Sequence, residues 1–406
     1  GPNRYSIRLP KFFISMDLFR RENLLTLPDE MTEIILDNLK IKDIQNLSRV
    51  CRALRRVTKL YHFGVAYPVW KDTTIELESV DGNLPISNYR DGVFIEGKFY
   101  IAILEEGAPV CWILDFAPKP RWKKVPILID MEPDQFHPVK STSGAAIKYD
   151  IYMFGGESLL TGLPTKNMYK LNIKTMKLSK LPESGALPAP RFMHSLNAVG
   201  LHHLILFGGR CLIDNGELYD TKDFSVYDIY KNTWIVHASR SNIPYSRSLH
   251  TSTVICGKLF IYGGQHISCH SPNSSIHDDE DVWEYDFLKN EWHRYLAPTS
   301  SSFLLPKEWF STAGIGPGKR CGSAIFPLRR KIVVLGGSAK NFAIDNHLEH
   351  MTVFCPVRKT WTRILVQGMP RLECIATKVN RMGDRTNVFV IGKNVEGKFV
   401  TGWIFD

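Results

Sequence analysis

The chain has 406 residues, of which 44% are hydrophobic, and its 51 basic and 41 acidic side chains give a formal net charge of +10. This length allows one small and one large domain, and no apolar run approaches the length of a membrane-spanning helix, which excludes a helical membrane protein. The basic excess is spread over the chain, so an acidic protein partner explains it better than nucleic acid, and eight scattered cysteines predict a reducing compartment, the cytoplasm or the nucleus.

Residues 1–19 are expected to be an extension outside the folded domains. They begin with Gly1-Pro2-Asn3, which looks like the scar of a cleaved tag. The residues that follow are basic and apolar but lack the long apolar core of a signal peptide. The sequence predicts no role for this extension.

Residues 20–62 predict two or three short helices. The first begins at Leu27-Pro28, because proline is tolerated in a first helical turn and the acids that follow favour the positive end of the helix. Apolar residues then recur at helical spacing; they are Met31, Ile34, Ile35, Leu39, Ile44, Leu47, Val50, Cys51 and Leu54. So short a segment cannot bury a core of its own, and its apolar faces therefore need a partner.

The string LPDEMTEIILDNLKIKDIQNLSRVCRALRRV, which begins at Leu27, resembles the F-box over residues 24–58. Leu-Pro with an acid, the Ile/Leu stripe and Leu-Ser-Arg-Val-Cys carry the resemblance, and Leu54 departs from it where an aromatic residue is usual. The resemblance implies a Skp-type adaptor as partner. The residues implied in or behind that contact are Leu27, Pro28, Ile34, Ile35, Leu47, Val50 and Cys51. The apolar stripe alone also fits a helical cap on the next domain.

Short apolar runs in the rest of the chain end in glycine at matching points. Gly-Gly pairs begin at Gly155, Gly208, Gly263 and Gly336, and Ile391-Gly392 takes the fifth place. The steps of 53, 55, 73 and 55 residues between these positions indicate a β-propeller of four-stranded blades. An earlier, degenerate copy has Ile101-Ala102 at the diglycine place.

Each repeat also has a strand that ends near an Asp or Asn, with a large apolar residue six positions later. The pairs are Asn172 and Leu178, Asp228 and Trp234, and Asp286 and Trp292, while Cys355 and Trp361 keep the spacing and Asp115 precedes Trp122 by one residue more. This pattern resembles the kelch repeat. Glycine allows the backbone to turn sharply after the second strand, and tryptophan is expected to fill the space between neighbouring blades.

The two ends of the repeat region predict how the ring closes. The last copy ends at Asp406 without its Trp strand, whereas Trp70 lies 52 residues before Trp122, in step with the repeat. We therefore expect the strand around Trp70 to complete the last blade, which removes an open sheet edge. The prediction is an all-β six-bladed kelch propeller over residues 63–406 with a small α-helical F-box domain before it. Five blades with an irregular cap are the alternative.

The longest connections fall on one rim of the predicted propeller. In a four-stranded meander, the connections between strands two and three and between successive blades share a rim. The long ones on this rim cover residues 157–167, 210–223, 265–280, 296–318 and 338–350. Long loops on one rim indicate a binding surface, and the helices are expected at the opposite rim.

Four arginines enter successive blades on the long-loop rim and are expected around the mouth of the central channel. Guanidinium groups bind carboxylate and phosphate, and the resemblance to kelch-type ligase receptors implies an acidic or phosphorylated substrate segment. The expected substrate-binding residues are Arg191, Arg247, Arg320 and Arg371, with Phe303, Trp309 and Phe310 as apolar anchors. The alternative is that each arginine pairs with an acid in the adjacent blade.

No cofactor, metal site or catalytic residue is predicted. His194 and His250 recur in phase, three residues after an arginine, which favours packing roles. One loop has residue types that suit zinc, but their spacing matches no paired-ligand pattern; they are His266, Cys269, His270, His277 and Asp278.

Together the two resemblances imply a non-catalytic substrate receptor of a cullin-RING (SCF-type) ubiquitin ligase. The helices would bind a Skp-type adaptor, and through it a cullin and a RING protein, while the propeller would hold a protein substrate close to the transfer step. Two alternatives stay open. One is a kelch enzyme of the oxidase or sugar-modifying type with a helical cap, and the other is an F-box scaffold outside degradation.

Overall fold

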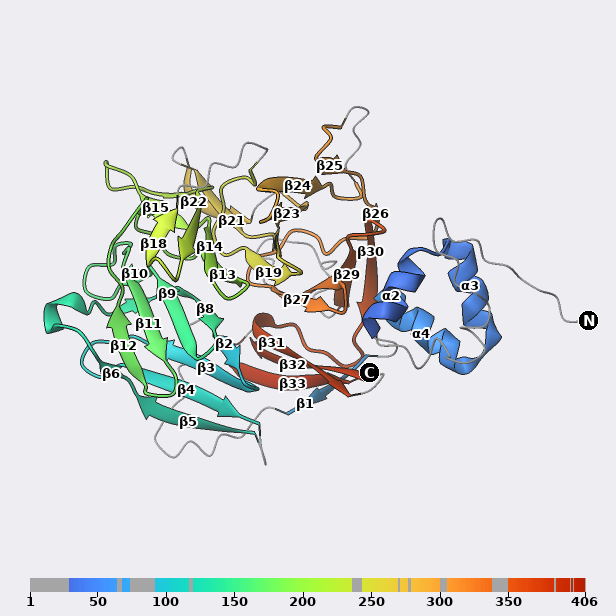
Figure 1. The fold of residues 1–406 in the computed structure, drawn as a ribbon, viewed down its shortest axis with the longest axis horizontal. Helices are drawn as coiled ribbons and strands as arrows, with labels where there is room; N and C mark the ends of the chain where they lie inside the picture. The colour runs from blue at the N-terminus through green and yellow to red at the C-terminus, as the bar shows by residue number, and fades with distance from the viewer. Residues whose placement is uncertain are drawn as a thin grey trace, which may run out of the picture.

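The computed structural model describes residues 29–63, 68–73, 92–116, 120–235, 243–268, 271–276, 279–299, 305–337, 350–382, 385–394, 396 and 398–405. Within this part of the chain, three helices lie beside a ring of β-sheets (Figure 1). The helices are α2 (Asp29–Asp37), α3 (Ile41–Val50) and α4 (Arg52–Phe63), and a short 3-10 turn, η2, covers Pro133–Gln135. None of the described helices is long and apolar enough to cross a membrane.

The ring has six antiparallel blades, as predicted. Blade one contains β2 (Val93–Ile95), β3 (Lys98–Ile103), β4 (Val110–Asp115) and β5 (Arg121–Pro126). Blade two contains β8 (Ser143–Ile147), β9 (Asp150–Phe154), β11 (Met168–Asn172) and β12 (Lys177–Lys180). Blade three contains β13 (Ser195–Val199), β14 (His203–Phe207), β17 (Phe224–Asp228) and β18 (Thr233–Ile235). The first strand of each blade lies at the centre of the ring and the fourth at its periphery (Figure 1).

The remaining blades follow the same order. Blade four contains β19 (Thr251–Ile255), β20 (Lys258–Tyr262), β23 (Val282–Asp286) and β24 (Glu291–Tyr295). Blade five contains β27 (Ala324–Leu328), β28 (Lys331–Leu335), β29 (His350–Cys355) and β30 (Thr360–Leu365). Blade six contains β31 (Glu373–Met382), β32 (Arg385–Lys393), β33 (Phe399–Phe405) and, from the other end of the chain, β1 (Val69–Asp72).

Strand β1 closes the ring as the sequence predicts. Trp70 pairs with Ile404 in an antiparallel register, and the Trp70 ring lies directly over Gly402, where a Cβ atom would collide with it. This pairing gives the last blade its fourth strand, so the closure and the six-blade count are confirmed. Joining the two ends of the chain leaves β33 without an open edge.

The repeated tryptophans fill the space between neighbouring blades. The ring of Trp234 in blade three lies 5.1 Å from Phe154 in blade two, and Trp361 in blade five lies 5.9 Å from Tyr262 in blade four. In each case the partner aromatic directly precedes a diglycine pair. These contacts confirm the packing role that the repeat predicts for tryptophan.

The diglycine pairs connect each blade to the next. Gly208 and Gly209 have φ angles of +67° and +100°, which only glycine adopts readily. The Gly209 N–H donates a 2.8 Å hydrogen bond to the carbonyl of Arg247 in the following segment. A Cβ atom on Gly208 would press against the same carbonyl, so both glycines are required by the close approach of the two chains.

Short strands add to this framework on the long-loop rim and at the periphery. On the rim, β7 (Val139–Lys140) pairs with β10 (Glu157–Ser158) from the next connection, while two hairpins pair β15 (Arg210–Leu212) with β16 (Leu218–Asp220) and β21 (Gln265–Ser268) with β22 (Ser271–Ile276). At the periphery, β6 (Leu128–Ile129), β25 (Trp309–Phe310) and β26 (Ala313–Gly314) pair in parallel with β12, β24 and β30. These peripheral strands cover edges that could otherwise pair with another chain.

Candidate functional site

The helices carry several large apolar side chains that are exposed to solvent. Ile34 on α2 is 46% exposed and Val50 at the end of α3 is 69% exposed, as the predicted adaptor surface requires. Met31 and Ile41 are exposed to a similar degree, 50% and 54%. Ile41 was not among the predicted contact residues, because it precedes the apolar periodicity of the second helix.

The other predicted adaptor residues differ in exposure. Ile35 and Leu47 are half-buried, whereas Cys51, between α3 and α4, is exposed. Leu27 and Pro28 lie outside the described residues. The role of all these residues in adaptor binding stays a prediction, and partial burial of Ile35 and Leu47 fits support of such a surface better than direct contact.

Arg358 attaches the helices to blade five. It lies in the turn between β29 and β30, and its Nε donates a 2.7 Å hydrogen bond to the Tyr61 hydroxyl on α4. Its Nη2 donates to the carbonyls of Leu36 and Leu39 at the end of α2, at 3.0 and 3.1 Å. The positive guanidinium thus satisfies carbonyls at the negative end of a helix, which is a favourable arrangement.

A second turn of blade five, between β27 and β28, makes ionic contacts with α2. Arg330 forms a 3.0 Å ion pair with Asp37, and its backbone N–H donates to Glu33 at 3.1 Å. The Lys331 ammonium lies 4.1 Å from the centre of the Tyr61 ring. Burial, together with the hydrogen bond to Asp37, raises the pKa of Tyr61, while burial lowers the pKa of Lys331. Both turns belong to the rim opposite the long loops, so the helices lie where the sequence predicts.

Three of the predicted substrate-binding arginines are enclosed by the fold. Arg191, Arg247 and Arg320 are 0%, 0% and 1% exposed. Each donates from Nη1 to the carbonyl of the first diglycine residue of its own blade; the acceptors are Gly208, Gly263 and Gly336, at 2.9, 3.1 and 3.0 Å. The expectation that these three cations face the channel mouth is wrong, because their donors hold the backbone of the blade they enter.

The acids that pair with these arginines also differ from the expected ones. Asp223 lies 3.6 Å from Arg191, and Asp279 lies 2.6 Å from Arg247. Both acids belong to the same blade as their arginine and not to the adjacent one. The alternative, in which the arginines form structural ion pairs, is therefore correct for Arg191 and Arg247, except that each pair forms within one blade and not between adjacent blades.

Arg371 differs from the other three arginines in position and environment. The Arg247 carbonyl accepts a hydrogen bond from Gly209, the second residue of the preceding diglycine pair. In the last blade the corresponding bond runs from Gly337 to the Leu372 carbonyl, at 2.8 Å. Leu372 is thus the equivalent of Arg247, and Arg371 lies one residue out of phase. Arg371 is exposed, and its role in substrate binding stays a prediction.

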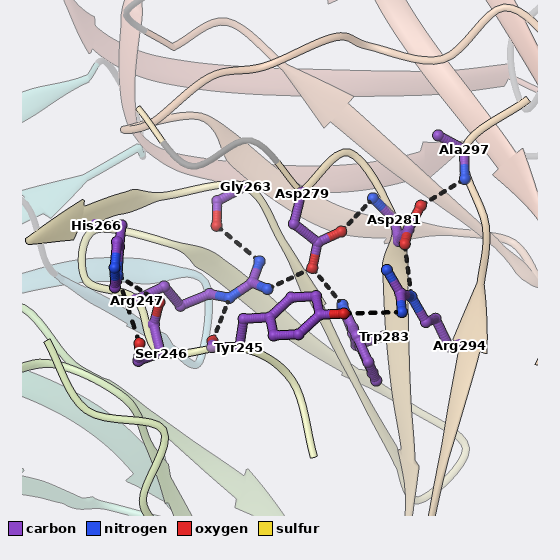
Figure 2. Close-up of polar contacts among 10 residues, drawn as sticks. All are labelled: Tyr245, Ser246, Arg247, Gly263, His266, Asp279, Asp281, Trp283, Arg294 and Ala297. Atoms are coloured by element: carbon purple, nitrogen blue, oxygen red, sulfur yellow. Dashed lines mark hydrogen bonds and ion pairs between the residues drawn. The ribbon is translucent and has the colours of Figure 1, made fainter. Parts of the chain in front are cut away.

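The Arg247 ion pair belongs to a closed polar network at the rim of blade four (Figure 2). Asp279 accepts hydrogen bonds from Arg247 Nη2, from Trp283 Nε1 at 2.7 Å and from the Asp281 N–H at 2.8 Å. Burial raises the pKa of Asp279, but the charge and the hydrogen bonds of Arg247 outweigh burial and hold this pKa below its usual range. Burial and the charge of Asp279 raise the pKa of Asp281, which accepts from Arg294 at 2.6 Å.

Trp309 and Phe310 form β25 at the outer edge of blade four. The Arg294 guanidinium lies 4.4 Å from the centre of the Trp309 ring, and the Phe310 ring lies 5.1 Å from that of Tyr295. Both aromatic residues are half-buried, so part of each contributes to the blade itself. Their role as substrate anchors stays a prediction, and Phe303 lies outside the described residues.

The central channel encloses about 420 Å³ and is lined by polar and apolar residues of the inner strands and of the segments that enter them; Ser143, Ser195, Thr251 and Ser323 are among the polar ones. Backbone hydrogen bonds join the segments that enter these strands: Met193 donates to Ser141 at 3.3 Å and Leu249 donates to Met193 at 3.0 Å. All three residues have positive φ angles, between +51° and +58°. The sequence did not predict these backbone contacts around the channel, because a positive φ angle is expected at glycine and none of the three residues is a glycine.

The recurring histidines pack against aromatic residues next to this channel. His194 lies 5.7 Å from Phe154, and His250 lies 5.2 Å from Phe207. Burial, aided by the charge of Arg191, lowers the pKa of His194 to about 3, so it stays neutral at physiological pH. The packing role predicted for both histidines is confirmed.

No group of three or more His, Cys, Asp or Glu side chains that could hold a metal ion occurs in the described part of the chain. His266 is described, and its Nδ1 lies 3.2 Å from the Ser246 carbonyl. The other residues of this loop whose types would suit zinc lie outside the described residues; they are Cys269, His270, His277 and Asp278.

Comparison with protein families gives two matches. The family model of the KLHDC2/KLHL20/DRC7 Kelch-repeats domain matches residues 141–392, and the F-box domain model matches residues 24–65. The first match covers blades two to five and part of blade six, and the second covers all three helices.

Individual proteins with similar sequences match this chain at low identity or over a short part of its length. Kelch domain-containing protein 3 of Bos taurus is 24% identical over 238 residues, which cover 55% of this chain and 56% of that protein. A Rho GTPase-activating protein, gacHH, of Dictyostelium discoideum is 28% identical over 151 residues, 37% of this chain and 8% of that protein. The N-(sulfonatooxy)prop-2-enimidothioate sulfolyase of Thlaspi arvense is 32% identical over 115 residues, 27% of this chain and 28% of that protein. The chain thus spans about half the length of the first of these relatives and less of the others.

Proposed function

This chain belongs to the family of the KLHDC2/KLHL20/DRC7 Kelch-repeats domain and also carries an F-box, and we propose that it is a substrate-recognition subunit of an SCF-type ubiquitin ligase. In this role the F-box helices bind a Skp-type adaptor, and through it a cullin and a RING protein. The propeller binds a protein substrate and takes no part in the chemistry of ubiquitin transfer.

One observation carries the proposal. Exposed apolar side chains on the helices, Ile34 and Val50 among them, lie on a unit that is fixed by Arg358 to the rim opposite the long loops. A receptor that joins two partners needs two separate surfaces held at a constant distance, because the substrate must stay within reach of the transferred ubiquitin. The two rims of this propeller meet that requirement.

The test is affinity purification of the full chain from cells, with and without a proteasome block, followed by mass spectrometry. The adaptor and the cullin should be recovered with the wild type and lost with the double change Ile34→Asp and Val50→Asp, because burying an unpaired carboxylate costs several kcal/mol. Leu288→Asp is the matched control, since Leu288 is 92% exposed in a turn of blade four. Full recovery of the adaptor with the double variant would overturn the proposal.

A kelch-propeller enzyme is the second candidate, and the partial match to a sulfolyase is the observation that favours it. Turnover of a small sulfur- or sugar-containing substrate by the purified chain, without co-purifying adaptor, would support this candidate. An F-box scaffold outside degradation is the third candidate. It predicts that the adaptor co-purifies but that no bound protein accumulates under the proteasome block.

A further inference from the structure

A loop on the long-loop rim of blade two exposes three leucines. Leu159, Leu160 and Leu163 follow strand β10 and are 41%, 59% and 47% exposed. Leu212, in the equivalent loop of blade three, is 38% exposed. The helices contact blade five, and blade two lies across the ring from them (Figure 1), so this cluster is far from the adaptor surface.

The leucine loop is held in one conformation by its own hydrogen bonds. Ser158 donates from its N–H to the Leu163 carbonyl at 2.9 Å and accepts from the Gly162 N–H at 2.8 Å. The Leu159 N–H donates to the Pro138 carbonyl at 3.0 Å, and the Ser158 hydroxyl accepts from the backbone of Leu160. An apolar loop that is already ordered loses little conformational entropy on binding, which favours its use as a docking surface.

The loops of blades two and three also connect to each other at their bases. The Arg191 N–H donates to the Thr165 carbonyl at the end of the leucine loop, at 2.9 Å. The next residue, Phe192, forms a bridge with Arg210 at the start of the blade-three loop. These contacts, together with the hydrogen bond from Leu159 to Pro138, join three segments into one continuous stretch of rim. We call it the blade two–three rim; it consists of residues 130–140, 157–167 and 210–223.

The blade two–three rim is acidic, although the whole chain is basic. It holds eight acidic and four basic side chains, whereas the chain has a net charge of +10. Three of the four cations, Lys140, Lys166 and Arg210, are within ion pairs. Five exposed carboxylates on this rim have no cationic partner among the described residues; they are Asp130, Glu132, Asp134, Asp214 and Glu217. Of the basic residues, only Lys222 is exposed here without an ion pair to another described side chain.

From this combination we infer that the blade two–three rim is the substrate-docking surface, and that it takes a protein segment in which leucine-like side chains alternate with lysine or arginine. The apolar side chains would cover Leu159, Leu160 and Leu163, and the cations would face the unpaired carboxylates, since complementary charge steers and orients association. This inference rests on the proposed function as a substrate receptor. It differs from the acidic substrate segment expected from the sequence, because three of the four arginines that would have bound such a segment, Arg191, Arg247 and Arg320, are enclosed.

The inference is tested by selecting from a random peptide display library on the purified full chain in complex with its adaptor. The selected peptides should be enriched in lysine and arginine next to large apolar residues. The double change Leu160→Ser and Leu163→Ser should weaken the affinity for a selected peptide by roughly tenfold or more, because two apolar anchors are lost. Leu201→Ser with Leu288→Ser is the matched control, since both leucines are exposed in turns of the opposite rim.

A second variant tests the charge separately from the leucines. Glu132→Gln with Asp134→Asn removes two exposed carboxylates without changing the leucine loop, and it should weaken the same peptide and reduce the salt dependence of its affinity. Enrichment of acidic peptides, a failure to select any peptide, or equal affinity for all variants would overturn the inference. Recovery of the adaptor is measured on the same proteins. If the wild type does not bind the adaptor, the proposed function is contradicted. If the wild type and all variants bind the adaptor normally, and the leucine and charge variants bind the selected peptide as tightly as the wild type does, this inference alone is contradicted.

Discussion

Arg358 donates a 2.7 Å hydrogen bond to the hydroxyl of Tyr61, although 297 positions of sequence separate them. The same guanidinium caps the end of α2 through two carbonyls. The helices and blade five are therefore joined by charge-assisted hydrogen bonds, which are stronger than bonds between neutral groups. This junction sets the distance and orientation between the helices and the long-loop rim.

The first prediction concerns this junction. Arg358→Ala should destabilise the attachment of the helices by about 2 kcal/mol, because hydrogen bonds to a charged group are lost and two helix carbonyls lose their donor. Hydrogen exchange should accelerate over residues 29–63 while the propeller stays protected. Lys289→Ala, at an exposed lysine on the same rim, is the control. Unchanged exchange in the helices would show that other contacts hold them.

Ring closure gives the second prediction. Trp70→Ala should lower the free energy of unfolding by about 3 kcal/mol, the low end of the range for tryptophan because Trp70 is half-buried. Gly402→Ala should also destabilise, since its new methyl group would meet the Trp70 ring. Denaturant unfolding measures both, with Val69→Ala, at an exposed site, as the control. A Trp70→Ala protein as stable as the control would mean that β1 contributes little to closure.

The third prediction separates two reasons for a glycine. Gly216 and Gly208 both have positive φ angles, +86° and +67°, but an added Cβ atom would touch nothing within 4 Å at Gly216 and would meet the Arg247 carbonyl at Gly208. Gly216→Ala should therefore cost about 1 kcal/mol from backbone conformation alone. Gly208→Ala should cost at least about 2 kcal/mol more, because neighbouring backbone must move. Similar thermal unfolding of the two variants would argue against close blade contact at the diglycine pair.

The fourth prediction is a pH dependence. The lowered pKa of Asp279 means that its ionised form stabilises the folded chain above the unfolded pKa of about 3.9 and that this contribution is lost as the pH falls. Arg247→Met should cost about 3–5 kcal/mol at pH 7, because it leaves a buried carboxylate without its cation. The difference from the wild type should shrink towards pH 3.

Urea unfolding at pH 7 and pH 3 measures this difference. Lys222→Met is the control and should change stability little at either pH, because Lys222 is exposed and has no ion pair with a described side chain. An Arg247→Met deficit of the same size at both pH values would mean that the arginine acts through its hydrogen bonds to carbonyls and not through Asp279.

The sequence by itself determined the features of this protein that depend on local chemistry and on the repeat. Diglycine turns and the spacing of the tryptophans are fixed by backbone conformation and side-chain volume, so their period predicts six blades and assigns Trp70 to the last one. The F-box pattern likewise depends on the spacing of a few apolar residues within a short segment. These signals survive without knowledge of any long-range contact.

Only the tertiary structure decided which charges and apolar groups are exposed. Arg247 and Arg371 look equivalent in sequence, yet Arg247 is enclosed by the carbonyl of Gly263 and the carboxylate of Asp279, whereas Arg371 lies one residue out of phase and is exposed. Leu160 resembles many buried leucines, but the hydrogen bonds of its loop hold it outward. Burial is decided by how neighbouring blades approach each other, and that approach is a property of the whole ring, which no single repeat encodes.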